Sequence, residues 1–245
     1  MELNPLSVTV LGLCFVWSGF VRAGLGFGGG AIMMPFALLV LDSPIFIVPV
    51  LAVQLFLFSC ITLVQFHENI DWPVALKLVA VLSIPVFAGI RGLVDLPVFW
   101  LNILVYAIVI AYALHYIFQF RITYDSRIID FITLCVGGYV TGVSLTGSPP
   151  IVAVTAKYVP KEKLRETLFV LWAIIVSLKI AALLSYRVDL QLRHQIWLLP
   201  CAGIGHYLGL LFHQRLLTVR NDRFNRLIGI ILLVVTGLGL FKLCL

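Results

Sequence analysis

Charged residues are scarce in this chain. Asp, Glu, Lys and Arg make up 11% of its 245 residues, whereas hydrophobic residues make up 62%. The mean hydropathy is +1.10. Soluble domains carry roughly 25% charged and about 45–50% apolar residues, and no soluble core of this size could bury so much apolar surface. The composition therefore predicts a protein whose solvent is the lipid bilayer.

Motifs of the common enzymes are also missing. The chain contains no HExxH, GxSxG or Walker-type GxxxxGK[ST] sequence, and no pair of carboxylates lies inside an apolar run. Its five cysteines lie in apolar runs, without a CxxC pair or a histidine at metal-ligand spacing. We therefore expect no enzyme, no metal site and no cofactor. ATP hydrolysis is not expected either, so any energy that the protein needs would come from an ion gradient or the membrane potential.

Basic residues outnumber acidic ones, and the formal net charge is +6. No basic and aromatic patch is long enough to follow a nucleic acid, so we expect no nucleic-acid partner. Two loops, 157–165 and 215–226, concentrate Lys and Arg. Two crossings separate them, and the positive-inside rule makes their shared side cytoplasmic. The N-terminus lacks the basic region of a signal peptide, so we expect its apolar run to stay on the protein.

Ten apolar runs divide the chain. Six of them have the roughly 17–25 residues that a bilayer crossing requires, and they begin at residues 45, 73, 97, 166, 194 and 224. The other four are mostly shorter and flank two glycine-containing breaks; they cover 6–22, 29–41, 127–144 and 150–159. We interpret each flanking pair as a broken helical hairpin with its tip inside the membrane. Unpaired backbone at that depth is tolerated only inside protein or beside a wet cavity.

The two breaks occupy corresponding places in two halves of the chain. Gly-Leu-Gly-Phe-Gly-Gly-Gly at 24–30 aligns with the glycine- and proline-containing segment 138–150, so that Gly28 falls on Gly147. Each half, 1–120 and 127–245, is then a broken hairpin plus three transmembrane helices. An odd number of crossings predicts inverted-topology repeats within one membrane domain. Paired Gly/Pro-interrupted segments indicate a transporter binding site at the repeat interface.

These motifs resemble a known family. Gly-Phe-Gly-Gly-Gly-x-x-x-x-Pro at 26–35 and Gly-Val-Ser-x-Thr-Gly-x-Pro-Pro-Ile at 142–151 are similar to the paired signatures of the TauE/SafE family, also called the toluene-sulfonate uptake permease family. The segment 161–168 resembles the loop that follows the second signature. Ser148 stands where many members have a glycine, and Leu145 replaces a common small residue. The resemblance implies transport of sulfite or an organosulfonate, most often export across a bacterial inner membrane.

The breaks supply the first candidate site residues. Unpaired N–H groups at a helix N-terminus, with the positive end of the helix dipole behind them, attract anions. Serine and threonine hydroxyls beside the breaks add donors. The alternative is that these small residues only allow close helix packing. The substrate-binding residues predicted at the breaks are Gly28, Gly29, Gly30, Ser144, Thr146, Gly147 and Ser148.

Four further polar residues lie within apolar runs. Arg22 is either a counter-charge for the anion or a helix-end arginine that reaches the surface. Gln54 either lines the cavity or joins helices. Histidine has an intrinsic pKa near neutrality, so His206 is a candidate proton relay. The alternative role of His206 is a hydrogen bond to a neighbouring helix. Lys179 is a second candidate for ion or proton coupling, and it too could reach the membrane surface instead.

The sequence thus predicts an all-α polytopic secondary-active transporter. It would carry a small sulfur-containing anion by alternating access around a site at the membrane midplane. Its partners would be the anion, the lipid bilayer and, at His206 or Lys179, a coupling proton, whereas the oligomeric state stays open. The alternatives are an anion channel on the same scaffold and an intramembrane sulfur-handling accessory protein. The accessory protein would be expected to carry a cluster of Cys, His or carboxylates, which this sequence lacks.

Overall fold

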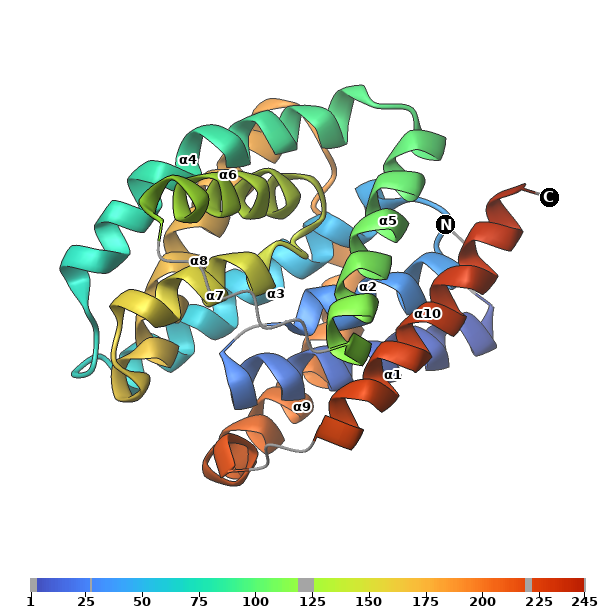
Figure 1. The fold of residues 1–245 in the computed structure, drawn as a ribbon. Coiled ribbons are helices and arrows are strands. Elements are labelled where there is room, and N and C mark those ends of the chain that lie inside the picture. Colours follow the sequence, from blue (N-terminus) through green and yellow to red (C-terminus); the bar gives the residue numbers. More distant parts are fainter. Residues whose placement is uncertain (1–3, 27, 119–125, 219–221, 245) are drawn as a thin grey trace.

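The protein is all-helical throughout the residues that its structure, a computed structural model, describes: 4–26, 28–118, 126–218 and 222–244. The all-α prediction is therefore confirmed. The helices are α1 (Pro5–Leu25), α2 (Gly29–Val40), α3 (Pro44–Gln65), α4 (Trp72–Asp95), α5 (Val98–Phe118), α6 (Arg127–Ser144), α7 (Ser148–Tyr158), α8 (Lys161–Ser185), α9 (Leu192–Thr218) and α10 (Asp222–Cys244) (Figure 1).

Eight helices of the described chain are long and apolar enough to cross a membrane, and the two others are α2 and α7. All six predicted crossings are among the eight. The runs before the breaks, predicted at 6–22 and 127–144, form the continuous helices α1 and α6, of 21 and 18 residues. In each of them a central glycine, Gly19 or Gly138, stays helical and lets a neighbouring helix approach closely. The only short arms are α2 and α7.

Each short helix folds back on the long helix before it. At the start of α2, Gly29 lies against Ser18 and Arg22 of α1, where a side chain would find no room. At the far end of α7, Lys157 and Tyr158 both donate to the carboxylate of Asp130 at the start of α6, each at 2.6 Å. The two broken units are thus helical hairpins. Their depth in the membrane stays a prediction.

The non-helical part of each break is narrower than the sequence predicts. In the first break, only Gly26–Gly28 separates α1 from α2, and Phe27 lies outside the described residues. In the second, only 145–147 separates α6 from α7. The helix α7 already begins at Ser148 because proline is tolerated in the first turn, where N–H groups have no intrahelical partner. Gly26 and Gly28 have φ angles of 81° and 85°, which favour glycine.

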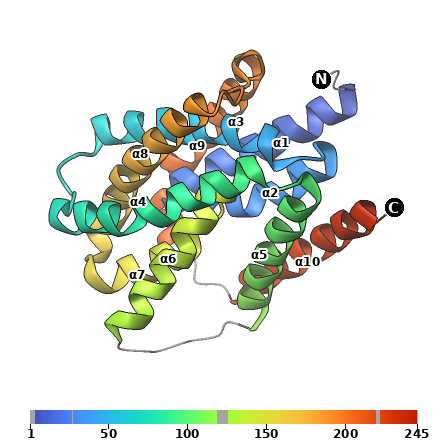
Figure 2. The ribbon, with the colours of Figure 1, turned by 90° about the horizontal axis from the view of Figure 1, so that it is seen from above.

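Corresponding helices of the two halves pack in corresponding ways. The helix α1 lies along α9 as α6 lies along α4, whereas α3 contacts α8 and α5 contacts α10 (Figures 1 and 2). Gly89 of α4 packs against the carbonyl of Tyr139, and Gly209 of α9 packs against the carbonyl of Phe20. Phe20 and Tyr139 are aligned in the register of the two breaks. The packing therefore recurs in both halves, while the in-plane two-fold axis stays a prediction.

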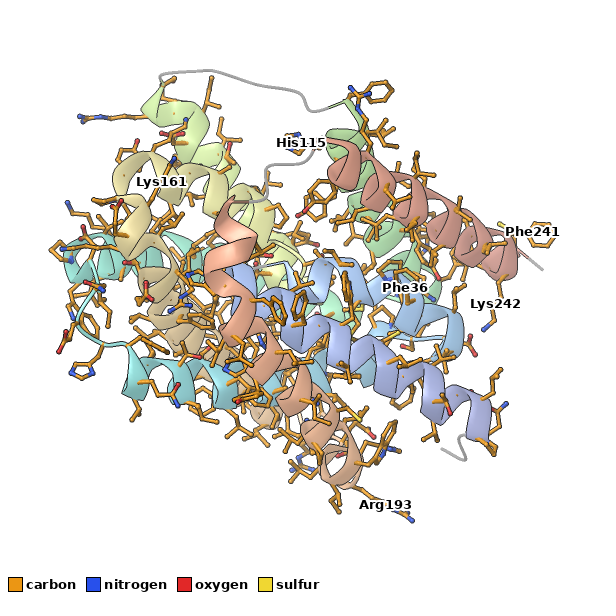
Figure 3. The ribbon with its side chains drawn as sticks, turned by 90° about the horizontal axis from the view of Figure 1, so that it is seen from below. Phe36, His115, Lys161, Arg193, Phe241 and Lys242 are labelled. Carbon is orange, nitrogen blue, oxygen red and sulfur yellow. The ribbon has the colours of Figure 1, made fainter. Side chains whose placement is uncertain are left out.

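The first basic loop and the start of α9 lie at opposite edges of the molecule. Figure 3 places Lys161, at the start of α8, and His115, in the last turn of α5, at one edge of the molecule. Arg193, near the start of α9, lies at the opposite edge. This arrangement fits the predicted cytoplasmic loop 157–165. Most side chains of the second basic loop, 215–226, lie outside the described residues.

Candidate functional site

The structure brings the two breaks together inside the protein. The backbone N–H of Gly28, which caps α2, donates to the hydroxyl of Ser148, the first residue of α7, at 3.2 Å. Gly30 lies so close to the carbonyl of Leu145 that a Cβ atom there would be 2.8 Å from the oxygen. The tips of the two hairpins are therefore in direct contact. This contact requires glycine on one tip and a hydroxyl on the other.

A small cavity lies beside this contact, with a volume of about 30 Å³. One water molecule requires roughly 10–15 Å³ of such space, so the cavity is large enough to hold water or a small ligand. Five predicted substrate-binding residues line the cavity: Arg22, Gly28, Gly29, Gly30 and Ser148. The remaining lining comes from both breaks, α1, α3, α6 and α8.

The first tip presents backbone to the cavity. The helix α2 begins at Gly29 without a side-chain cap, and the first N–H groups of a helix have no partner within it. Glycine places no side chain between these groups and the cavity. A helix of the other half holds the loop before α2, because Trp172 Nε1 of α8 donates to the carbonyl of Gly26 at 3.0 Å. A ring nitrogen of His213 lies 2.5 Å from the carbonyl oxygen of Gly24.

The second tip is built differently. The hydroxyls of Ser144 and Thr146 bond each other at 2.6 Å, and both side chains are buried. Gly147 packs so tightly against the backbone of Gly137 and Thr141 that a Cβ atom would overlap both. These three predicted residues therefore lie behind the cavity wall and do not line it. Only Ser148 of the second tip's predicted residues reaches the cavity.

Arg22 is the most unusual lining residue. It is 4% exposed, and its Nε and Nη2 atoms have no hydrogen-bond partner among the described residues. Its guanidinium carbon lies 5.1 Å from the centre of the Phe58 ring. No ion pair within the described part of the chain includes it. A buried cation without a counter-charge is unfavourable, so the site favours an anion in the cavity.

Comparison with known proteins identifies the family of the chain. The family model described as sulfite exporter TauE/SafE matches residues 11–240, which include both breaks. The chain belongs to the TauE/SafE family. No curated protein and no solved structure matches the chain. As a TauE/SafE protein, it is an integral membrane transporter of a sulfur-anion exporter family and not an enzyme.

Two other predicted residues of this TauE/SafE protein lie outside the cavity lining. Lys179 of α8 is fully buried, and its Nζ donates to the carbonyls of Thr141 and Gly142 at 2.9 and 2.6 Å. Those carbonyls belong to the last turn of α6, where a cation is favoured by the helix dipole. Gln54 of α3 donates to the side chain of Gln195 on α9 at 3.2 Å. Gln54 thus joins two helices, which is the second of its predicted roles.

His206 lies one side chain away from the cavity. Its Nε2 is 3.2 Å from the hydroxyl oxygen of Thr62, and its ring stacks on Phe58 with centres 4.7 Å apart. Phe58 is the ring that also contacts Arg22. His206 therefore neighbours the lining cation without lining the cavity itself.

Sequence reasoning missed several lining residues, including Ser18, Thr141 and Trp172. Thr141 could have been found, because it aligns with Arg22 in the register of the two halves. Trp172 lies in a long apolar run, and its only signal is an indole N–H that needs an acceptor when buried. The acceptor, Gly26, lies in the other half of the chain. Only the fold reveals that pair.

Proposed function

We propose that this TauE/SafE protein is a secondary-active transporter that binds sulfite or an organosulfonate in the cavity between α2 and α7. The single observation that carries the proposal is the unpaired guanidinium of Arg22 in the cavity wall. A charged side chain at the centre of a membrane costs roughly 2.5–3.5 kcal/mol on insertion scales. A bound anion offsets that cost, and the unpaired N–H groups at the start of α2 add donors.

The arrangement of the site supports sulfur oxyanions among small anions. Their oxygens accept several hydrogen bonds at once, and the cavity combines a guanidinium, backbone N–H groups and the Ser148 hydroxyl. A guanidinium presents its donors in a planar fork that fits oxyanions. Chloride makes less use of such a fork because it presents one spherical acceptor. We therefore infer sulfite or a sulfonate as the substrate and export as the direction typical of the family.

The position of the cavity, between the tips of two helical hairpins, supports a carrier. A carrier closes around its substrate and opens to one side at a time, whereas the alternative, an anion channel, needs a continuous path while open. Two hairpins meeting at a small cavity suit alternating access if they belong to inverted repeats, 1–120 and 127–245. The recurring packing of α1 on α9 and of α6 on α4 supports that division. The boundary between the repeats falls around 119–125, outside the described residues.

The decisive test compares wild type with Arg22→Gln, measuring the affinity of the purified proteins for sulfite. We expect a loss of about thirtyfold or more, because a buried charge pair with one partner removed costs about 2–5 kcal/mol. Without sulfite, Arg22→Gln should melt at or above the wild-type temperature, since it removes an unpaired buried charge. Arg91→Gln is the matched control, because Arg91 pairs with Asp95 on an exposed helix face. Unchanged sulfite affinity in Arg22→Gln would contradict the proposal.

Flux assays separate the alternatives. Reconstituted protein should move sulfite, thiosulfate, sulfoacetate or taurine at a saturating rate and discriminate against chloride. Large single-channel currents would favour the channel instead. Binding of a sulfur anion without any flux would favour the accessory protein. If no sulfur anion binds or moves, the substrate class is wrong while the fold stands.

A further inference from the structure

His206 carries an unused proton-accepting atom. The hydroxyl of Thr62 donates to the carbonyl of Phe58 at 2.8 Å, so its single hydrogen is already committed. Toward His206 Nε2, at 3.2 Å, the Thr62 oxygen therefore acts as acceptor. Nε2 must then carry the hydrogen of the neutral imidazole, which leaves Nδ1 with a free lone pair. Nδ1 is buried and has no hydrogen-bond partner among the described residues.

Phe58 joins this histidine to the lining cation. His206 stacks on the Phe58 ring, with centres 4.7 Å apart, and the Arg22 guanidinium carbon lies 5.1 Å from the same ring centre. Arg22 also acts electrostatically on His206. A proton at Nδ1 would therefore place a second buried cation beside an unpaired one. Coulomb repulsion opposes this as long as the cavity holds no anion.

We infer that His206 is the proton-binding site of the transporter, and that a proton at its Nδ1 and an anion at Arg22 bind together. The inference rests on the proposed anion site. An anion in the cavity neutralises Arg22 and removes the repulsion, so each ligand favours the other to the same extent. One proton and one singly charged anion would then enter the binding region with little net change in its charge. His206 would couple anion movement to the proton gradient.

Among the charged groups near His206 in the described part of the chain, Arg22 is the one whose charge is not compensated by a partner. The helix α1 contributes Arg22, and α8 contributes Arg165, which pairs with Glu166 at 2.7 Å. The helix α3 presents Phe58 and Thr62 to His206, and neither titrates. Arg165 is thus already compensated, while Arg22 is not. Burial opposes a proton at His206 in every state, and the state of the cavity decides how much the charge of Arg22 adds to that opposition.

The sign of the pH effect follows from this linkage. With the anion bound, protonated His206 is more favourable than without it, so the anion binds more tightly as pH falls through the range in which His206 titrates. Sulfite affinity no longer depends on His206 at pH values where this histidine is neutral both with and without the anion, or protonated both with and without it. One proton per anion changes affinity by at most about tenfold per pH unit.

The test measures sulfite affinity of purified wild type and His206→Gln by calorimetry at about pH 6 and about pH 8. Sulfite itself titrates in this range, but its contribution is identical for both proteins. We expect the affinity ratio between the two pH values to be about tenfold larger for wild type than for His206→Gln. The control His115→Gln, at an exposed site on α5, should keep the wild-type ratio. Equal ratios in wild type and His206→Gln would overturn the inference.

Two further outcomes keep the inference separate from the proposed function. If wild type binds no sulfite at either pH, the anion site is wrong and the proton site falls with it. If sulfite binds in an Arg22-dependent manner without the pH difference, only the proton site is wrong. Should His206→Gln not fold, Thr62→Val removes the acceptor that holds Nε2–H. It should shift the pH dependence of sulfite affinity to more acidic pH, and an unchanged profile would count against the inference.

Discussion

The two breaks occupy the same place in each half, but they differ in what they offer an anion. Gly28 and Gly147 each cap a short helix. Behind Gly28, glycines leave the first N–H groups of α2 open to the cavity. Behind Gly147, α7 begins Ser148-Pro149-Pro150, and proline has no N–H to donate. The second tip thus supplies a hydroxyl, whereas the first supplies backbone donors.

The buried cations of the two halves differ in the same way, because among the described residues one has unpaired donors and the other does not. Arg22 of the first half lines the cavity with two nitrogen atoms unpaired, whereas Lys179 of the second half donates to the carbonyls of Thr141 and Gly142. In the proposed site, the first half therefore supplies the groups that would recognise an anion, and the second half forms a support in which Lys179 is already paired. A repeated backbone plan does not require a symmetric site. It requires only that the two tips meet.

The largest expected effect comes from adding a methyl group to the supporting tip. Gly147→Ala would drive a Cβ atom into the backbone of Gly137 and the side chain of Thr141, neither of which can retreat from a hairpin interior. We expect little folded protein by size-exclusion chromatography in detergent. Gly28→Ala meets only a Val21 methyl at 3.8 Å and should fold, with a loss of about 1–2 kcal/mol from its left-handed φ.

The opposite result would reverse the roles of the two tips. If Gly147→Ala melts like wild type while Gly28→Ala fails to fold, the second tip is the looser one. Folded Gly28→Ala should also bind sulfite more weakly, because its methyl group lies at the cavity wall. Undiminished sulfite affinity in this variant would show that the backbone of Gly28 does not approach the anion.

An intermediate effect is expected at Lys179. In Lys179→Met the carbonyls of Thr141 and Gly142 lose charged donors, which should lower the free energy of unfolding by about 1–3 kcal/mol. Sulfite affinity of the folded variant should stay within about threefold of wild type, because Nζ bonds to α6 and does not line the cavity. Lys163→Met, at an exposed position of the same helix, is the control. Lost sulfite binding at an unchanged melting temperature would make Lys179 the counter-charge.

The features predicted from sequence are those that local residue chemistry determines. Long apolar runs predict membrane helices, and glycine beside proline predicts where they stop; the caps Gly28 and Gly147 fall in the predicted register. The second break was predicted to begin at Gly138, which instead stays inside the continuous helix α6, as Gly19 stays inside α1. Gly19 makes room for the carbonyl of Ala202 on α9, and that partner cannot be found from local pattern.

The site was predicted at the level of segments more than of side chains. Arg22 and the first-tip glycines were found because a charge or an unwound backbone in an apolar run is costly wherever it lies. The pairing of Gln54 with Gln195, and of Ser144 with Thr146, depends on side-chain geometry after folding. Hydroxyls and amides beside a break can face a cavity or each other. Composition and spacing do not distinguish the two.

The smallest expected effect sharpens the comparison between the tips. Pro149→Ala restores an N–H group in the first turn of α7 at a half-buried position that remains compatible with helix. If the two tips differ because the second lacks donors, sulfite affinity should rise by up to about tenfold, since an imperfect hydrogen bond gains less than the roughly 1.5–3 kcal/mol of a full one to a charged group. The free energy of unfolding should change by about 1 kcal/mol or less.

Pro160→Ala is the control, because Pro160 lies at the cap of α8 and outside the cavity lining. It tests for a general effect of losing proline, and its sulfite affinity should equal that of wild type. A loss of affinity in Pro149→Ala alone would mean that the rigid ring of Pro149, and not its missing donor, is what the second tip contributes.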